Sequence, residues 1–288
     1  MCDNLMCSEH SQSARKELSM DEERVINQID AVSAASAKGP RPKDEDFILT
    51  WEMEIGDSIV HALFLLDGMG GGKAGEKASE MGAVFAMRHI SDVLAEEHVK
   101  DREARHEMLL GSILNADRAV RALAEEIGDG ARCGSTLVVY LVIHGIEGRT
   151  CDLAWIGDSR AYTLDSDGSA TLRSADHSTT GEMVEAGYIE LWEISKTPGH
   201  NVLTRSLGCP EDEWKGGEVV AIDTDGVDAL LLCCDGVWGP LHGKNGLILA
   251  NGGDILDAEA WVAAALSAES NDNCSVLVTQ LDALRAVG

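Results

Sequence analysis

Apolar side chains return along the chain at two spacings, one typical of strands and one typical of helices. Strand-like segments are short apolar runs bounded by glycine, proline or acidic turns. Helix-like segments carry apolar side chains every three or four residues. The predicted strands cover residues 47–54, 58–66, 136–143, 151–156, 160–164, 170–173, 218–222, 229–234 and 275–281. The predicted helices cover residues 74–98, 104–127 and 257–269.

The order of these segments indicates a fold class. Short turns such as Ile55-Gly56-Asp57 join most consecutive strands, so we expect largely antiparallel sheets. Long helices bury their apolar stripes against sheet faces, which predicts a layered α+β domain. The first residues are polar and charged. We therefore expect a polar extension over residues 1–27 and one folded domain over residues 28–284.

Composition narrows the classes of partner. The chain has 288 residues, 44% of them hydrophobic but only 4% aromatic, so the core should be mostly aliphatic. Its 23 basic and 50 acidic side chains give a net charge of −27. A surface this acidic repels phosphate backbones and anionic lipids. We therefore expect no nucleic-acid and no membrane partner.

The eight cysteines point to a reducing compartment. None of them forms a CxxC pair or a zinc-type spacing, and cysteines in apolar runs usually act as small hydrophobic side chains. The N-terminal residues contain no apolar signal core. These features predict a cytoplasmic protein.

Aspartates at the ends of apolar runs suggest a metal site. Asp-Gly is usually a turn signal, but Asp67 follows the run ALFLL and Asp235 follows the run ALLLCC. Asp158 follows LAWIG, and Asp272 lies just before the last predicted strand. If these strand ends converge, like charges crowd in a partly buried site, and a divalent cation would relieve the cost. All-oxygen ligands suit hard ions such as Mg²⁺ or Mn²⁺.

Eight short motifs extend this picture to most of the chain. They are GPRPKDED (39–46), LDGMGG followed by GEKAS (66–79), GST (134–136), IGDSR (156–160), ADHS (175–178), NVLTRSLG (201–208), CDGVW (234–238) and DN (272–273). In this order and spacing they resemble the metal-dependent protein phosphatases of the 2C type, in their bacterial form. The resemblance implies a four-layer αββα sandwich of two antiparallel β-sheets flanked by helices. It also implies a variable flap, at about residues 179–200, that borders the cleft.

The resemblance assigns a metal-binding role to several of these residues. The implied ligands are Glu45, Asp46, Asp67, Gly68, Asp158, Asp235 and Asp272. Asp67 would bridge two Mn²⁺ or Mg²⁺ ions, and the backbone carbonyl of Gly68 would bind one of them. Asp235 and Asp272 would complete the other site. Asp158 would contribute, with Asp235, to a third and weaker position.

The implied reaction is hydrolysis of phosphoserine and phosphothreonine in proteins. In such two-metal sites a water between the ions loses a proton more easily and attacks phosphorus in line. Glu45 and Asp46 would bind a metal directly or through water, and Arg41 would pair with the phosphate oxygens through its forked guanidinium. Arg41 and Asp67 are therefore the expected catalytic residues. The expected partners are phosphorylated proteins, the substrates of a cognate Ser/Thr kinase.

Some positions depart from the family pattern. Gly72 replaces a histidine common in bacterial members, and Asp44 replaces an asparagine. Gly239 stands where an aspartate often follows the tryptophan, which predicts a weaker third metal position. His177 lies in a motif, and we expect a supporting or capping role for it, not a ligand role.

Two other interpretations stay open at this point. The chain could be a pseudophosphatase, a binding or regulatory module that keeps the fold and uses its cleft for recognition. Asp67, Asp235 and Asp272 are all in place, which argues against that reading. The chain could also be an acidic, cation-binding or adaptor protein without this fold. Carboxylates that do not meet in space would support the latter.

Overall fold

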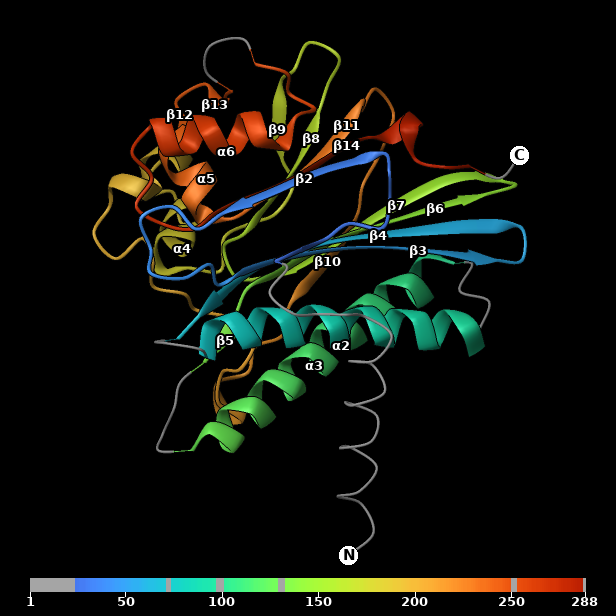
Figure 1. Ribbon diagram of the computed structural model, residues 1–288, viewed down its shortest axis with the longest axis horizontal. Coiled ribbons are helices and arrows are strands. Elements are labelled where there is room, and N and C mark those ends of the chain that lie inside the picture. Colours follow the sequence, from blue (N-terminus) through green and yellow to red (C-terminus); the bar gives the residue numbers. More distant parts are fainter. Residues whose placement is uncertain (1–23, 71–73, 97–100, 129–132, 250–252, 287–288) are drawn as a thin grey trace, which may run out of the picture.

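The computed structural model describes residues 24–70, 74–96, 101–128, 133–249 and 253–286. Two β-sheets pack face to face, and helices cover the outer face of each (Figure 1). Helices α2 and α3 lie on one outer face, and α5 and α6 lie on the other. The predicted four-layer αββα sandwich is confirmed.

The first sheet is antiparallel except at one edge, where β1 pairs parallel with β3. Its strand order is β1-β3-β4-β6-β7-β10, and β5 extends the pairing of β4. The predicted hairpin is confirmed as β3 and β4, and Gly56 adopts a φ of 55° in the turn. The strands are β1 (Val25–Ile26), β3 (Asp46–Ile55), β4 (Ser58–Met69), β5 (Gly134–Ser135), β6 (Leu137–Gly145), β7 (Gly148–Ile156) and β10 (Glu218–Ala221).

The second sheet is antiparallel throughout, in the order β2-β14-β11-β8-β9. A separate two-stranded ribbon, β12 with β13, follows α5. The strands of the sheet are β2 (Val32–Ala37), β8 (Arg160–Leu164), β9 (Ala170–Leu172), β11 (Ala229–Cys233) and β14 (Cys274–Gln280). The ribbon consists of β12 (His242–Gly243) and β13 (Gly246–Leu247).

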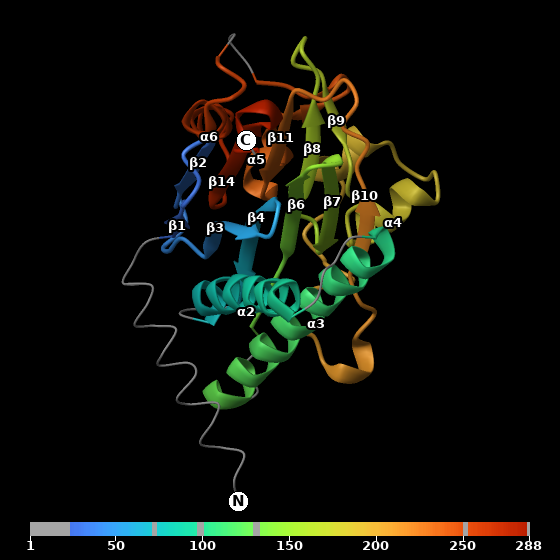
Figure 2. The same cartoon turned by 90° about the vertical axis from the view of Figure 1, so that its right-hand side faces the viewer.

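The helices divide between the two outer faces. The view of Figure 2 shows α2 and α3 beside each other below the first sheet, while α6 lies beside β2 and β14. Asp101 caps the start of α3 by accepting from the Ala104 amide. The α-helices are α2 (Ala74–Glu96), α3 (Arg102–Ile127), α4 (Thr179–Glu185), α5 (Asp235–Leu241) and α6 (Ala258–Ser267). The 3₁₀ turns are η1 (Leu191–Lys196), η2 (Glu211–Glu213) and η4 (Leu281–Ala283).

Strands of the first sheet are buried on both faces. In β4, Leu63 and Leu65 belong to the core between the two sheets, whereas Phe64 and Leu66 belong to the core under α2 and α3. Successive strand residues point to opposite faces, so a strand between two cores is apolar at most positions, although His61 in β4 is also buried. This explains the unbroken apolar runs in the sequence.

Several short elements were not predicted. Helix α5 is only 7 residues long and contains Pro240, so it has too few turns to produce a helical repeat. The 2-residue strands β1 and β5 are recognisable only from their pairing. Residues 1–23 and Gly72 lie outside the described residues. The division at residue 27 stays a prediction, although Val25–Ile26 already pairs with the first sheet.

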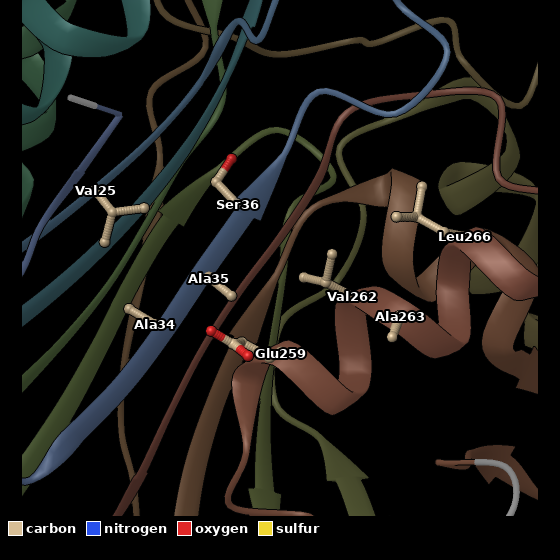
Figure 3. A pocket seen from close by; sticks show the side chains of 8 residues that line it. All are labelled: Val25, Ala34, Ala35, Ser36, Glu259, Val262, Ala263 and Leu266. Atoms are coloured by element: carbon tan, nitrogen blue, oxygen red, sulfur yellow. The ribbon is translucent and has the colours of Figure 1, made fainter. Parts of the chain in front are cut away.

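A groove of about 480 Å³ lies at one edge of the molecule, between β2 and α6. Figure 3 shows small and aliphatic side chains on its walls, with the carboxylate of Glu259 beside them. None of the predicted metal ligands lines it.

Among the described helices, none has both the length and the apolar character needed to cross a membrane.

Candidate active site

The acidic strand ends meet at one end of the sandwich. In the first sheet, Asp46 begins β3 and pairs directly with Asp67 near the end of β4. In the second sheet, β11 ends just before Asp235 and β14 begins just after Asp272. Because neighbouring antiparallel strands start and end at the same edge, each sheet contributes a pair of carboxylates. Asp158 adds a fifth from the loop after β7.

Asp67 is the centre of this group. Burial raises the pKa of its carboxyl well above the ordinary value, and four neighbouring acids raise it further. Those acids are Asp46, Asp235, Asp158 and Asp272. Acids distant in sequence therefore lie within electrostatic reach of one side chain.

Asp46 and Glu45 enter this group from the start of β3. Asp46 is completely buried, and neither of its carboxylate oxygens has a hydrogen-bond partner among the described residues. Burial raises its pKa to about 8, helped by the charges of Asp44 and Asp235 and opposed by a nearby hydroxyl and a nearby thiol. Glu45 also has a buried, unpartnered Oε1, and burial raises its pKa while Arg41 opposes the shift.

Asp235 and Asp272 approach each other through two tightly packed backbone segments. A Cβ on Gly236 would lie 1.9 Å from the Asn273 carbonyl oxygen, so only glycine allows this approach. Burial and the charge of Asp272 raise the pKa of Asp235 to about 6, against lowering by a hydrogen bond with Asp67. The Oδ1 atom of Asp235 is buried without a partner within the part of the chain that the structure describes.

Gly68 and Asp158 are held at the borders of the group. A Cβ on Gly68 would lie 2.2 Å from the Gly75 carbonyl oxygen and 2.6 Å from that of Glu45. Asp158 is 5% exposed, and its carbonyl accepts a 2.9 Å hydrogen bond from Trp238 Nε1. Burial and the charge of Asp235 raise the pKa of Asp158 well above the ordinary value. All seven predicted ligands thus lie in or beside one site.

Arg41 lies at the rim of the same site. Its guanidinium is paired with the carboxylate of Asp272, and its Nε donates to the Asn271 carbonyl at 3.1 Å. The side chain is 49% exposed, so the guanidinium faces solvent as well as the acids. A positive group at the mouth of an acidic site can bind an incoming anion.

Asn273 supports the site and was quoted in a motif without a role. Its Nδ2 donates to the carbonyls of Lys38 and Lys43, and its Oδ1 accepts from the Glu45 amide at 2.9 Å. This one amide group therefore fixes the segment that carries Arg41 and Glu45. The adjacent Asp-Asn letters were the only signal of it in the sequence.

Arg24 was missed altogether, and Thr136 was quoted in the GST motif without a role. Arg24 donates to the carbonyls of Asp46 and Glu45 and to Ser79 Oγ, so it anchors the start of β3. Thr136 Oγ1 accepts from the Asp67 amide at 2.9 Å and lies 2.7 Å from Ser159 Oγ. No local pattern identifies such contacts, because the partners are far apart in sequence.

The donor set fits a hard cation. All the converging side chains are carboxylates, and buried oxygens of Glu45, Asp46 and Asp235 lack partners within the described ranges. Such oxygens are costly unless a cation or a proton satisfies them. The side chains are not closed around an ion as they stand, since no three His, Cys, Asp or Glu residues among those described form a finished metal-binding group. One of the predicted ligands, Asp272, is paired with Arg41 instead.

Several known proteins are similar to this chain in sequence and in fold. Residues 43–269 match the Protein phosphatase 2C family. The chain is 30% identical over 221 residues to the serine/threonine phosphatase stp of Listeria innocua, which covers 76% of this chain and 83% of that protein. Its fold matches the serine/threonine phosphatase Stp1 from Staphylococcus aureus with a TM-score of 0.70 at 23% identity, over 92% of this chain and 99% of that one.

A further solved structure contains metal. It is the catalytic domain of the serine threonine protein phosphatase PstP in complex with two manganese ions, with a TM-score of 0.65 and 25% identity over 86% of this chain and 96% of that one. The family match spans most of the described chain, and the converging acids come from the motifs that suggested it. The chain therefore belongs to the protein phosphatase 2C family.

Proposed function

We propose that this family member hydrolyses phosphoserine and phosphothreonine in proteins, with two Mn²⁺ or Mg²⁺ ions held at the converging strand ends. The observation that carries the proposal is the set of buried, unpartnered carboxylate oxygens around Asp67. The proposed ligands are Glu45, Asp46, Asp67, Gly68, Asp158, Asp235 and Asp272. The manganese complex of PstP supports a two-ion site.

Each residue has a distinct part in the proposed chemistry. Asp67 lies between the acids of both sheets, so it is the natural bridge between two ions. Asp46 would serve the side of the first sheet, and Asp235 with Asp272 would serve that of the second. When bound, the ions would lower the pKa of a water and neutralise charge on the phosphoryl group during in-line attack.

Arg41 would bind the substrate. Its guanidinium is half-exposed and contacts only one acid oxygen of the site, from Asp272. A phosphate offers two oxygens to a forked guanidinium, so a phosphoryl group can replace Asp272 as its partner.

The proposal also covers the substrates, the compartment and the flap of the enzyme. The substrates would be phosphorylated proteins, the products of a cognate Ser/Thr kinase, and the compartment would be the cytoplasm. The segment over residues 179–200 contains α4 and η1 and would act as the flap beside the cleft. The catalytic domain would cover residues 28–284.

The test is turnover of phosphothreonine and phosphotyrosine peptides by EDTA-treated protein with and without Mn²⁺. We expect Mn²⁺-dependent hydrolysis that favours phosphothreonine and that Asp67→Ala and Asp235→Ala abolish. The matched control is Asp225→Ala, because Asp225 is also followed by glycine but is exposed in a turn. Full activity without metal would refute the proposal. Mn²⁺ binding without turnover would indicate the pseudophosphatase instead.

A further inference from the structure

His177 holds both polar backbone groups of the residue before Asp158. Its amide donates to the Gly157 carbonyl at 2.9 Å, and its ring Nδ1 accepts from the Gly157 amide at 3.1 Å. His177 itself is 4% exposed. Gly157 has a φ of 103°, a conformation that few side chains tolerate. These two hydrogen bonds therefore fix both peptide groups that flank the Gly157 Cα, where the backbone would otherwise be unusually free.

The surroundings of His177 select one form of its ring. Nδ1 can accept from an amide only when it carries no proton, so the proton must be on Nε2. Nε2 lies 3.2 Å from Glu218 Oε1, an acceptor suited to that proton. The donor Arg205 Nη1 lies 3.4 Å from Nε2 but is itself bound by Glu218 Oε1 at 2.8 Å. Burial and the nearby charge of Arg205 lower the pKa of His177, in keeping with a neutral ring. The ring also stacks on Trp155, with centroids 6.0 Å apart.

Further hydrogen bonds connect the loop after Gly157 to the acids around Asp67. Asp158 follows Gly157 directly, and its own carbonyl is held by Trp238 Nε1. Ser159 then bonds to Thr136, which accepts from the amide of Asp67. The loop that carries Asp158 is therefore fixed at successive residues, and His177 supplies its first attachment.

We propose that His177 is a positioning residue for Asp158. Its unprotonated Nδ1 fixes the Gly157 peptide and thereby directs the Asp158 carboxylate toward Asp235. The inference rests on the proposed metal-binding role of Asp158. The ADHS motif would thus support metal binding through His177, which does not itself contact an ion.

Three substitutions of the full chain separate this task from simple packing. In His177→Asn the amide oxygen can take the place of Nδ1 and still accept from Gly157. In His177→Gln the amide reaches the place of Nε2 instead, so the contact with Glu218 survives and the one with Gly157 is lost. His177→Phe keeps a ring against Trp155 and loses both. We expect calorimetric titration to show a loss of Mn²⁺ affinity at the weakest site of roughly tenfold for Gln and Phe, and recovery to within about threefold of wild type for Asn.

Asp158→Asn provides the reference for these measurements. In that background, His177→Gln should cause little further loss of Mn²⁺ affinity, because the two changes disrupt one feature. Wild-type Mn²⁺ binding by Gln and Phe, or equal losses in Asn and Gln, would overturn the positioning role while leaving the proposed function intact. Unchanged Mn²⁺ binding by Asp158→Asn itself would instead overturn the proposed role of Asp158 and this inference with it. Metal-free unfolding temperatures distinguish both results from a loss of folding.

Discussion

Two completely buried aspartates, Asp46 and Asp152, are treated in opposite ways by this protein. Asp152 in β7 accepts from Arg105 Nε at 2.5 Å and lies 3.1 Å from His106 Nε2. Asp46 in β3 has no partner for either oxygen among the described residues. An aspartate at the same burial is thus neutralised by the guanidinium of Arg105 in one place and left without a hydrogen-bond partner in the other.

The contrast separates buried acids that stabilise the fold from buried acids that belong to the candidate metal site. Placing a carboxylate in an apolar interior costs several kcal/mol unless opposite charge satisfies it. Asp152 meets that requirement within the fold, so its role is structural. Asp46 and its neighbours leave it unmet, which is typical of a site that awaits a cation. Substitutions made in one region at a time can therefore test whether the two regions differ in this way.

The largest expected effect concerns the paired region. Asp152→Ala removes the carboxylate that the buried guanidinium of Arg105 contacts, and we expect a loss of about 3–5 kcal/mol in the free energy of unfolding. Urea denaturation measures it. The activity per folded molecule should stay near wild type, since Asp152 is not part of the acidic site. A stability loss below about 1 kcal/mol would show that the pairing is not structural.

The next effect concerns the acidic site. Here we expect a substitution to lower activity and to raise the stability of the metal-free protein, the opposite of the result expected for Asp152→Ala. Asp67→Asn should lower kcat with Mn²⁺ by about 10²- to 10³-fold, because a bridging charge is lost. The same change should raise the melting temperature of the metal-free protein, because a neutral amide avoids the cost of burying a carboxyl whose pKa is raised by burial and by neighbouring acids. Steady-state kinetics and calorimetry measure the two. A metal-free protein that Asp67→Asn destabilises would contradict the account.

A smaller effect follows from pH. The folded protein raises the pKa of Asp46 to about 8 and that of Asp235 to about 6, from an ordinary value of 3.8. Both acids thus keep protons that the unfolded chain releases, and their contribution to stability is complete below about pH 4 and lost as pH rises toward about 8. The melting temperature of the EDTA-treated protein should fall by a few degrees between about pH 5 and 8. Asp46→Asn should show a smaller fall, and an equal fall in both proteins would assign the effect to the overall acidic charge.

The smallest effect concerns Gly239. A Cβ at this position would meet no atom within 4 Å among the described residues, so Gly239→Asp should change stability by less than about 0.5 kcal/mol. If the missing acid weakens the third metal position, the added carboxylate should lower the Mn²⁺ concentration for half-maximal activity severalfold. Titrating activity against Mn²⁺ measures this. An unchanged midpoint would separate Gly239 from metal binding.

The sequence predicted the elements whose signals are long and periodic. The hairpin of β3 and β4, the helices α2 and α3, and the unbroken apolar run of β6 all lie within a few residues of their expected bounds. The spacing of the acids left their convergence conditional, and only the family resemblance implied it. The contacts of Arg24, Thr136 and Asn273 were not predicted, because a hydrogen bond between distant segments depends on side-chain orientation that no local spacing encodes.

The most direct test of the central claim is a crystal structure of the protein grown with Mn²⁺, with diffraction recorded at the manganese absorption edge. We expect two anomalous peaks that share Asp67 as a ligand, with Asp46 on one side and Asp235 and Asp272 on the other. Manganese at other sites only, in crystals of protein that is active with Mn²⁺, would contradict this claim.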